Sequence, residues 1–128
     1  MVLKDGQPYV ERVVSAIDCG IVINPDAAAN MVQGAVVDGI GNAFYGGLTL
    51  KNGALEQTDC YNYRLIRAPE APKKNDVHLV QNDIDPTGLG EPPFPPVLGA
   101  VANALYKITG KRFYQQPLSP QLNTPAAI

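Results

Sequence analysis

The sequence contains few of the residues that protein-held metal sites and hydrolytic sites require. Its 128 residues include one histidine, His78, two cysteines and no tryptophan. Cys19 and Cys60 form no Cys-x-x-Cys pair, so neither a zinc nor an iron–sulfur site is expected, and two buried free thiols are favoured over a disulfide. A lone histidine in an alternating apolar segment is expected to be structural or on the surface. Haem ligation and Ser-His-Asp catalysis therefore lack their usual residues.

The sequence also lacks clusters of positive charge and long hydrophobic segments. Its net charge is −2, and its largest basic cluster is Lys73-Lys74, so no nucleic-acid partner is expected. No apolar run approaches the roughly 20 residues of a membrane span, and the polar first residues suggest no signal peptide. The location stays open between cytoplasm and periplasm. Hydrophobic residues make up 45% of the chain, enough for one domain with its own core, predicted over residues 1–128.

Turn signals and β-branched residues predict three strand regions. Asp5-Gly6 and Asn52-Gly53 are favoured two-residue turns, and each predicts a β-hairpin. The second strand of the first hairpin is expected over residues 9–17, and a short strand over residues 77–81. The polar segment between the second hairpin and that strand is expected to be an irregular surface excursion.

Two helices are predicted from the spacing of apolar residues and from their end signals. Asn24 suits an N-cap and Pro25 the first helical position, so a helix is expected over residues 26–45. A second helix is expected over residues 96–109, and an irregular, proline-rich tail over residues 118–128. The predicted fold class is α+β: β-hairpins and a small mixed sheet packed with two main helices.

The first predicted helix carries three interior glycines, Gly34, Gly39 and Gly41. Each costs about 0.5–1 kcal/mol relative to alanine in a helix interior, so a reason for them is needed. Close packing of the helix on a sheet is the more common explanation. The alternative is that a ligand or another backbone approaches this face, with the amide of Gln33 beside it.

A constrained loop, DPTGLGEPPFPPV over residues 85–97, precedes the second predicted helix. Four of the twelve prolines fall within residues 92–96, and they fix the backbone directly after Glu91. One interpretation of Glu91 is a solvated carboxylate that complements the helix dipole. The other is a general base whose direction the prolines fix, while Gly88 and Gly90 let the backbone approach a ligand. The residues alone favour the first interpretation.

Two blocks of the sequence resemble a known family. The segments AIDCGIVINPD, QGAVVDGIGNAFYGGLTLKNG and QTDCYNYRLIR, followed by PTGLGEPPFPPVLGAVANALYKITGKRF, are similar to the C-terminal part of molybdenum hydroxylase large subunits. These belong to the xanthine oxidase and aldehyde oxidase family, in which the isoquinoline 1-oxidoreductase and molybdopterin-binding aldehyde dehydrogenase branch is the most similar. The resemblance spans nearly the whole chain, and it implies a fold like the molybdenum cofactor-binding domain.

The resemblance also implies roles for particular residues. Glu91, in the family's Gly-x-Gly-Glu motif, corresponds to the active-site base, and Gln33 to a glutamine that contacts the pterin cofactor. Gly34, Gly88 and Gly90 are expected beside that cofactor, which is molybdenum-molybdopterin of the pterin dinucleotide type. The implied reaction hydroxylates or oxidises aldehydes or N-heterocyclic aromatics with water-derived oxygen. The implied partners are the remainder of the large subunit, an iron–sulfur or haem electron-transfer subunit and a small-molecule substrate.

The length departs from the family, whose large subunits run to several hundred residues. The chain is therefore expected to be a C-terminal domain fragment that supplies one wall of a shared site. Alone it is expected to be inactive and to carry no cofactor. Met1 fits either a cut inside a larger protein or a natural short product. The competing functional hypothesis is a stand-alone, non-catalytic binding or assembly module that keeps the fold.

Overall fold

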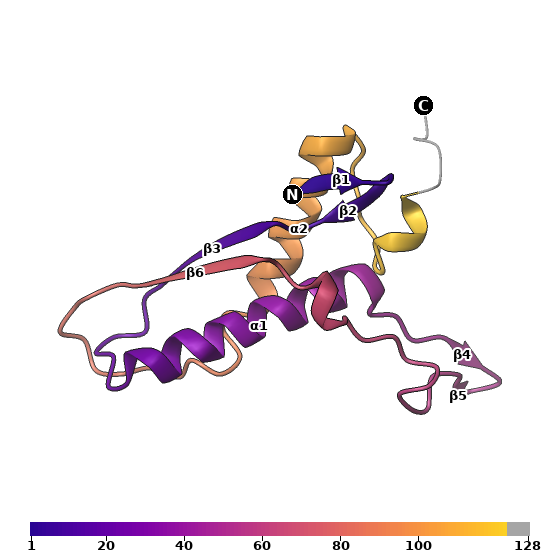
Figure 1. The fold of residues 1–128 in the computed structure, drawn as a ribbon. Coiled ribbons are helices and arrows are strands. Elements are labelled where there is room, and N and C mark those ends of the chain that lie inside the picture. Colours follow the sequence, from indigo (N-terminus) through magenta and orange to yellow (C-terminus); the bar gives the residue numbers. More distant parts are fainter. Residues whose placement is uncertain (123–128) are drawn as a thin grey trace.

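The structure, a computed structural model, describes residues 1–122. Helix α1 (Pro25–Tyr45) runs along one side of an elongated molecule, and helix α2 (Pro95–Thr109) crosses it (Figure 1). A pair of parallel strands, β3 (Arg12–Ile17) and β6 (Lys74–Leu79), lies over α1. The predicted α+β class is confirmed.

Both predicted helices form, with the end signals that the sequence indicates. The Asn24 side chain accepts a hydrogen bond of 3.0 Å from the backbone N–H of Ala27, which caps α1. Helix α2 ends at Gly110, whose φ of 71° places it in the left-handed region that favours glycine. Hence local sequence determines where α1 begins and where α2 stops.

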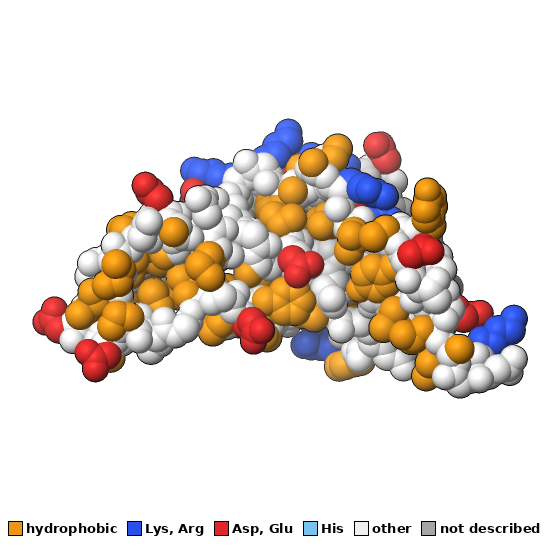
Figure 2. Space-filling model, turned by 90° about the horizontal axis from the view of Figure 1, so that it is seen from below, with side chains coloured by type: hydrophobic (Ala, Val, Ile, Leu, Met, Phe, Trp, Pro, Cys, Tyr) orange, Lys and Arg blue, Asp and Glu red, His pale blue; other side chains and the backbone are white. Residues whose placement is uncertain are grey.

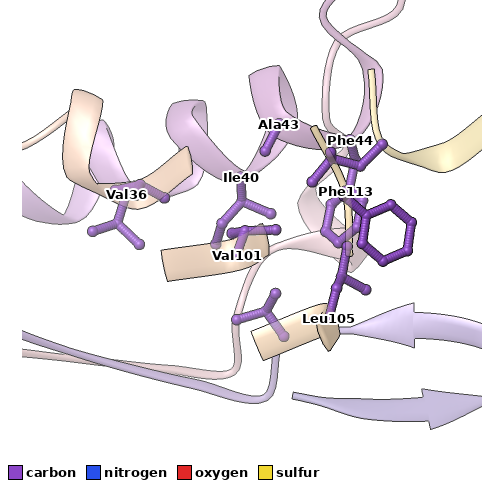
Figure 3. Packing of buried hydrophobic residues seen from close by; sticks show 10 residues of the cluster. Val36, Ile40, Ala43, Phe44, Val101, Leu105 and Phe113 are labelled. Atoms are coloured by element: carbon purple, nitrogen blue, oxygen red, sulfur yellow. The ribbon is translucent and has the colours of Figure 1, made fainter. Parts of the chain in front are cut away.

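The core forms where α1 and α2 cross. Val36, Ile40 and Phe44 project from one face of α1 toward Val101 and Leu105 of α2 (Figure 3). Their spacing along each helix places them on a single stripe, as expected for two helices that bury one face each. The most buried of the large side chains are Ile40, Leu105, Val32 and Val36.

Glycine makes this crossing close. A Cβ atom built on Gly39 would lie 2.7 Å from the Cβ of Val97, and one on Gly41 would lie 2.8 Å from the Cβ of Ile66. Both glycines therefore serve close packing, against a helix and a loop rather than against a sheet. A Cβ on Gly34 meets no atom within 4 Å, so packing does not explain that glycine.

The first predicted hairpin forms at its expected turn. Strands β1 (Val2–Lys4) and β2 (Gln7–Tyr9) are antiparallel, and Asp5 and Gly6 between them have φ values of 50° and 76°. Positive φ at both central residues is the geometry of a type I′ turn.

The second hairpin has the same turn chemistry. Strands β4 (Leu50–Lys51) and β5 (Ala54–Leu55) flank Asn52 and Gly53, at φ values of 52° and 80°. This hairpin stands away from the helices, as the ribbon shows (Figure 1).

The strand predicted over residues 9–17 is wrong in extent, because it is two strands with different partners. β2 pairs with β1, whereas β3 pairs with β6, in register from Arg12 opposite Lys74 to Ile17 opposite Leu79. β6 also begins earlier than the predicted residue 77. Alternation along the chain indicates that strands form but not which strand each one joins, so it does not reveal three separate pairs.

Two further expectations need correction. Cys19 is buried, but Cys60 is exposed, and both thiols are free. The segment from residue 118, expected to be irregular, begins with a buried core residue, Leu118, and a short 3₁₀ helix, η2 (Ser119–Gln121). The remaining part of the predicted tail, residues 123–128, lies outside the described residues.

Candidate functional site

A groove of about 650 Å³ brings three of the five predicted site residues together. Gly34 lies on its α1 side, and Gly90 and Glu91 lie on the loop that leads into α2. Figure 2 views the molecule from below, the side on which α1 lies in Figure 1, and shows single acidic side chains set among hydrophobic ones. The other residues of the groove are Asn30, Met31, Ala35, Asp38, Phe94 and Pro95.

One face of α1 forms the wall opposite Glu91. Asn30, Gly34 and Asp38 follow each other at intervals of four residues, so they lie in one row along the helix. Gly34 leaves a gap in the middle of this row, because it has no side chain and a Cβ built there meets no atom within 4 Å. The wall is therefore polar at both ends and open at its centre.

The loop that carries Glu91 is tied to the turn before α1. The backbone N–H of Thr87 donates to the carbonyl of Cys19 at 3.0 Å, and that of Ile21 donates to the carbonyl of Ile84 at 2.9 Å. Between these bonds Gly20 has a φ of 74°, and a Cβ there would lie 2.7 Å from the Ile84 carbonyl oxygen. Only glycine permits this approach of the two backbones.

The end of the same loop is fixed by a turn and by prolines. The N–H of Phe94 donates to the carbonyl of Glu91 at 3.0 Å, and Pro93 between them is buried. Pro95 then begins α2. The backbone of Glu91 is thus held on its C-terminal side by a turn whose proline φ angles are restricted.

The carboxylate of Glu91 is exposed and makes no hydrogen bond or ion pair with residues 1–122. It precedes the first turn of α2, which itself contains no acidic residue. A carboxylate without a protein partner keeps its oxygens free to accept a proton or a hydrogen bond from a molecule in the groove.

Gln33 and Gly88 are not among the residues of this groove. The Nε2 group of Gln33 donates to the backbone carbonyl of Asn75 on β6 at 3.1 Å, and the Nδ2 group of Asn75 donates back to the carbonyl of Gln33 at 3.3 Å. This reciprocal pair ties α1 to β6. The Oδ1 atom of Asn75 is buried without a hydrogen-bond partner. Gly88 is exposed, and nothing lies within 4 Å of where its Cβ would stand.

Sequence reasoning missed four side chains that line the groove: Asn30, Met31, Asp38 and Phe94. A usable signal was present, because Asn30 and Asp38 stand one helical turn before and after Gly34. Gly41 gives no such signal, since its face of α1 packs on Ile66. A glycine whose missing side chain points into a groove predicts that its neighbours four residues away line the same groove.

A second cluster lies at the far end of α1 and has the opposite character. The carboxylate of Glu70 accepts hydrogen bonds from the hydroxyl of Tyr45 at 2.8 Å, from Nη2 of Arg64 at 2.6 Å and from the N–H of Arg67 at 2.7 Å. The guanidinium of Arg64 also lies 3.5 Å from the centre of the Tyr45 ring. We call Tyr45, Arg64 and Glu70 the α1 clamp, because they hold the loop of residues 64–70 against the end of α1.

The hydrogen bonds of the α1 clamp change the acidity of two of its members. The hydrogen bond from Arg64, followed by that from the Arg67 N–H, lowers the pKa of Glu70 from 4.5 to about 2, against the opposing effect of burial. Burial, and then the hydrogen bond to Glu70, raises the pKa of Tyr45. Glu70 is therefore ionised near neutral pH, and its low pKa makes it an unsuitable proton acceptor there.

Comparisons with known proteins identify relatives of this chain. The chain is 25% identical to a nicotinate dehydrogenase subunit of Pseudomonas putida over 92% of its length, and 28% identical to the beta chain of isoquinoline 1-oxidoreductase from Brevundimonas diminuta over 88%. It spans only 10% and 14% of those two proteins.

A solved structure shares the fold. The copper- and molybdenum-containing CO dehydrogenase superposes with a TM-score of 0.71 at 22% identity, over 82% of this chain and 14% of that one. No helix within residues 1–122 is long and apolar enough to cross a membrane. Within the same residues no group of three His, Cys, Asp or Glu side chains is placed to hold a metal ion.

A family model described as the molybdopterin cofactor-binding domain matches residues 3–72, which include α1, the second hairpin and all of the first hairpin except Val2. The match covers more than half of the 128 residues. The resemblance to molybdenum hydroxylases inferred from the sequence is thereby confirmed, and the chain belongs to the molybdopterin cofactor-binding domain family.

Proposed function

We propose that this chain forms one wall of the active site of a molybdopterin-dependent oxidoreductase, with Glu91 as its general base. In this proposal residues 1–128 are a single C-terminal domain of a larger large subunit. The substrate is an aldehyde or an N-heterocyclic aromatic compound, to which the enzyme adds oxygen derived from water. The observation that carries the proposal is that Glu91, without a protein partner within residues 1–122, lines the same groove as Gly34, where the α1 wall has no side chain.

The residues of the groove fit a bulky cofactor with hydrogen-bonding groups. The groove volume lies within the range of about 300–1,000 Å³ that is usual for small-molecule sites. Side chains are missing at Gly34 and Gly90, where a bulky group needs room, and the amide of Asn30 offers both a hydrogen-bond donor and an acceptor. When bound, the cofactor supplies the two-electron oxidation and the activated oxygen, chemistry that protein side chains lack.

The residues of the chain would then hold and orient the molecules bound in the groove and accept a proton from them. Glu91 would accept a proton at one carboxylate oxygen, and its loop, fixed at both ends, keeps the backbone that carries this carboxylate in place. Phe94 covers one side of the groove with apolar surface and limits the access of water. Asp38 places a second carboxylate on the α1 wall, where it accepts hydrogen bonds from N–H or O–H groups of a bound molecule.

Gln33 and Gly88 belong to the proposal through the family resemblance, with roles adjusted to where they lie. The Oε1 atom of Gln33 has no hydrogen-bond partner within residues 1–122, so it is free to accept from an N–H group of the cofactor. Asn75 holds the other end of the same amide and fixes its orientation. Gly88 leaves the loop before Glu91 without a side chain, so that backbone and cofactor can approach each other.

The chain would work with the rest of its large subunit and with an electron-transfer subunit. The relatives described above are themselves named as subunits, which supports an assembly of several chains. Oxidation of the substrate would release two electrons that this chain has no group to hold, so an iron–sulfur or haem subunit is the proposed partner.

The test is Glu91→Gln in the complete enzyme. The amide keeps the size and hydrogen-bonding capacity of the carboxylate but does not accept the proton, so kcat should fall by about 10²–10⁴-fold. Molybdenum content and thermal stability should stay at the parent values. Glu11→Gln is the matched control, since Glu11 is exposed and lies outside the groove. Near-normal turnover of a fully loaded Glu91→Gln enzyme would refute the assignment.

A further inference from the structure

A second groove, of about 440 Å³, runs along β3 and is lined almost entirely by apolar residues. All six residues of β3 line it, together with one face of α2. Successive residues of a strand point to opposite faces. A groove that touches every one of them therefore follows the edge of the strand and not one face of the sheet. The α2 residues are Pro96, Val97, Ala100, Val101 and Ala104.

The backbone groups at this edge are unpaired. The carbonyls of Glu11 and Ile17 accept hydrogen bonds from Lys74 and Val80 on the β6 side, at 3.1 and 2.8 Å. Alternate residues of a strand direct their N–H and C=O groups to opposite edges. Hence Val14 and Ala16 direct theirs away from β6, and within residues 1–122 no strand pairs with that edge.

The side chains around the edge leave it incompletely covered. Val14 is 55% exposed, although a β-branched residue in the middle of a strand usually packs against a neighbour. On the α2 side, the short side chains of Ala100 and Ala104 leave space between the helix and the strand. A two-stranded sheet is marginal by itself, and parallel sheets are normally covered on both sides. The edge is built to receive another strand.

The first hairpin sets the direction from which such a strand would come. β1 pairs antiparallel with β2, with Val2 opposite Tyr9, and β3 continues the line of β2. Met1 already lines the groove. Residues 10 and 11 interrupt the strand between β2 and β3, and Met1 lies at the groove together with Val10 and Arg12. A segment that prolonged β1 from Met1 would therefore enter this groove and run antiparallel to β3 (Figure 1).

We propose that the groove receives an extended strand of the same large subunit, which pairs antiparallel with β3 and fills the groove with small apolar side chains. The proposal rests on the proposed function, because it takes the occupant from the rest of that subunit. The added strand would accept from and donate to the backbone of Val14 and Ala16. Side chains of valine or alanine size would pack against Ala100 and Ala104.

Backbone amide hydrogen exchange tests the pairing directly. In the 128-residue chain alone, the amides of Val14 and Ala16 should exchange faster than those of Val13 and Ser15, which face β6. In the complete large subunit the same two amides should slow by on the order of 100-fold or more. Equal exchange of Val14 and Ala16 in both proteins would overturn the proposal. So would a dimer of the chain alone in which they are already protected, because the occupant would then be a second copy.

Two variants separate the edge from the rest of the fold. Val14→Pro removes an N–H that faces the groove and no hydrogen bond to β6, and free strand edges tolerate such a substitution. Val14→Thr is the matched control, because it keeps that N–H. Both variants of the chain alone should show the parent circular dichroism, whereas in the large subunit only Val14→Pro should lower the yield of folded protein. Equal yields would contradict the inference. None of these measurements uses turnover, so their outcome is independent of the Glu91 test.

Discussion

The two halves of α1 use the same residue types for opposite purposes. In the first half, Gly34 opens a groove, and the glutamate that faces it, Glu91, has no partner within residues 1–122. In the second half, Gly39 is filled by Val97, and the nearby glutamate, Glu70, accepts three hydrogen bonds. Neither residue type identifies a functional site by itself. The difference is whether neighbouring residues fill the space beside the glycine and donate hydrogen bonds to the carboxylate of the glutamate.

This contrast supports the proposal that Glu91, and not Glu70, accepts the proton. A carboxylate whose pKa is lowered to about 2 is a weak base, because the hydrogen bonds that it accepts stabilise its ionised form. The carboxylate of Glu91 makes no hydrogen bond or ion pair with the described residues. Activity variants should therefore separate the two glutamates, with the turnover effect of Glu91→Gln the largest of all the changes considered.

The glycines sharpen the contrast at the level of stability. Gly39→Ala should destabilise the chain by about 1–3 kcal/mol, because the new Cβ would lie 2.7 Å from the Cβ of Val97. Gly34→Ala should instead stabilise it by about 0.5–1 kcal/mol, because the methyl group has room and alanine favours the helix. Urea unfolding of the 128-residue chain measures both. A Gly34→Ala chain as unstable as Gly39→Ala would show that the groove is not open.

Gln33 tests whether the far side of the α1 wall also serves the cofactor. In the complete enzyme, Gln33→Ala should lower molybdenum content more than it lowers the melting temperature. Loss of the hydrogen bond to Asn75 costs about 0.5–1.5 kcal/mol of stability. Loss of an acceptor beside a buried cofactor costs about 1–3 kcal/mol of cofactor binding. A molybdenum content at the parent level together with a lowered melting temperature would mean that Gln33 only connects α1 to β6.

The smallest expected effect concerns the α1 clamp and depends on pH. The pKa of Glu70 is lowered in the folded chain, so its ion pair stabilises fully above pH 4.5 and is lost as the pH falls toward 2. Because the pair is partly exposed, it should contribute no more than about 1 kcal/mol. Glu70→Gln should flatten this part of the stability profile, measured by urea unfolding at several pH values between 6 and 2.5. Asp76, whose pKa is lowered by its hydrogen bond from Arg12, keeps some pH dependence and provides the internal control. Parallel profiles for parent and variant would contradict the role of the clamp.

The sequence was sufficient for features that neighbouring residues determine. The cap at Asn24, the stop at Gly110 and the turns at Asp5-Gly6 and Asn52-Gly53 all follow from local chemistry. The change of partner between β2 and β3 was not predictable, because β3 pairs with a strand far along the chain. The exposure of Cys60 depends likewise on which segments cover it.

The candidate site divides in the same way. The stiffness around Glu91 is visible as a run of prolines, and the family resemblance draws attention to the residue. That Gly34 would face it, while the adjacent Gln33 would face β6, follows only from how α1 is rotated against its neighbours. A rotation of one residue along a helix changes the direction of a side chain by about 100°.

The anchoring of the Glu91 loop has a consequence for how molecules enter and leave the proposed site. One end of the loop is bonded to the turn at Gly20, and the other continues directly into α2. These bonds and the direct continuation into α2 oppose a displacement of the segment as a whole. In the proposed site, Glu91 would therefore present its carboxylate to each incoming molecule from a backbone that is held in place. A movement that times entry and exit would then come from the other walls of that site.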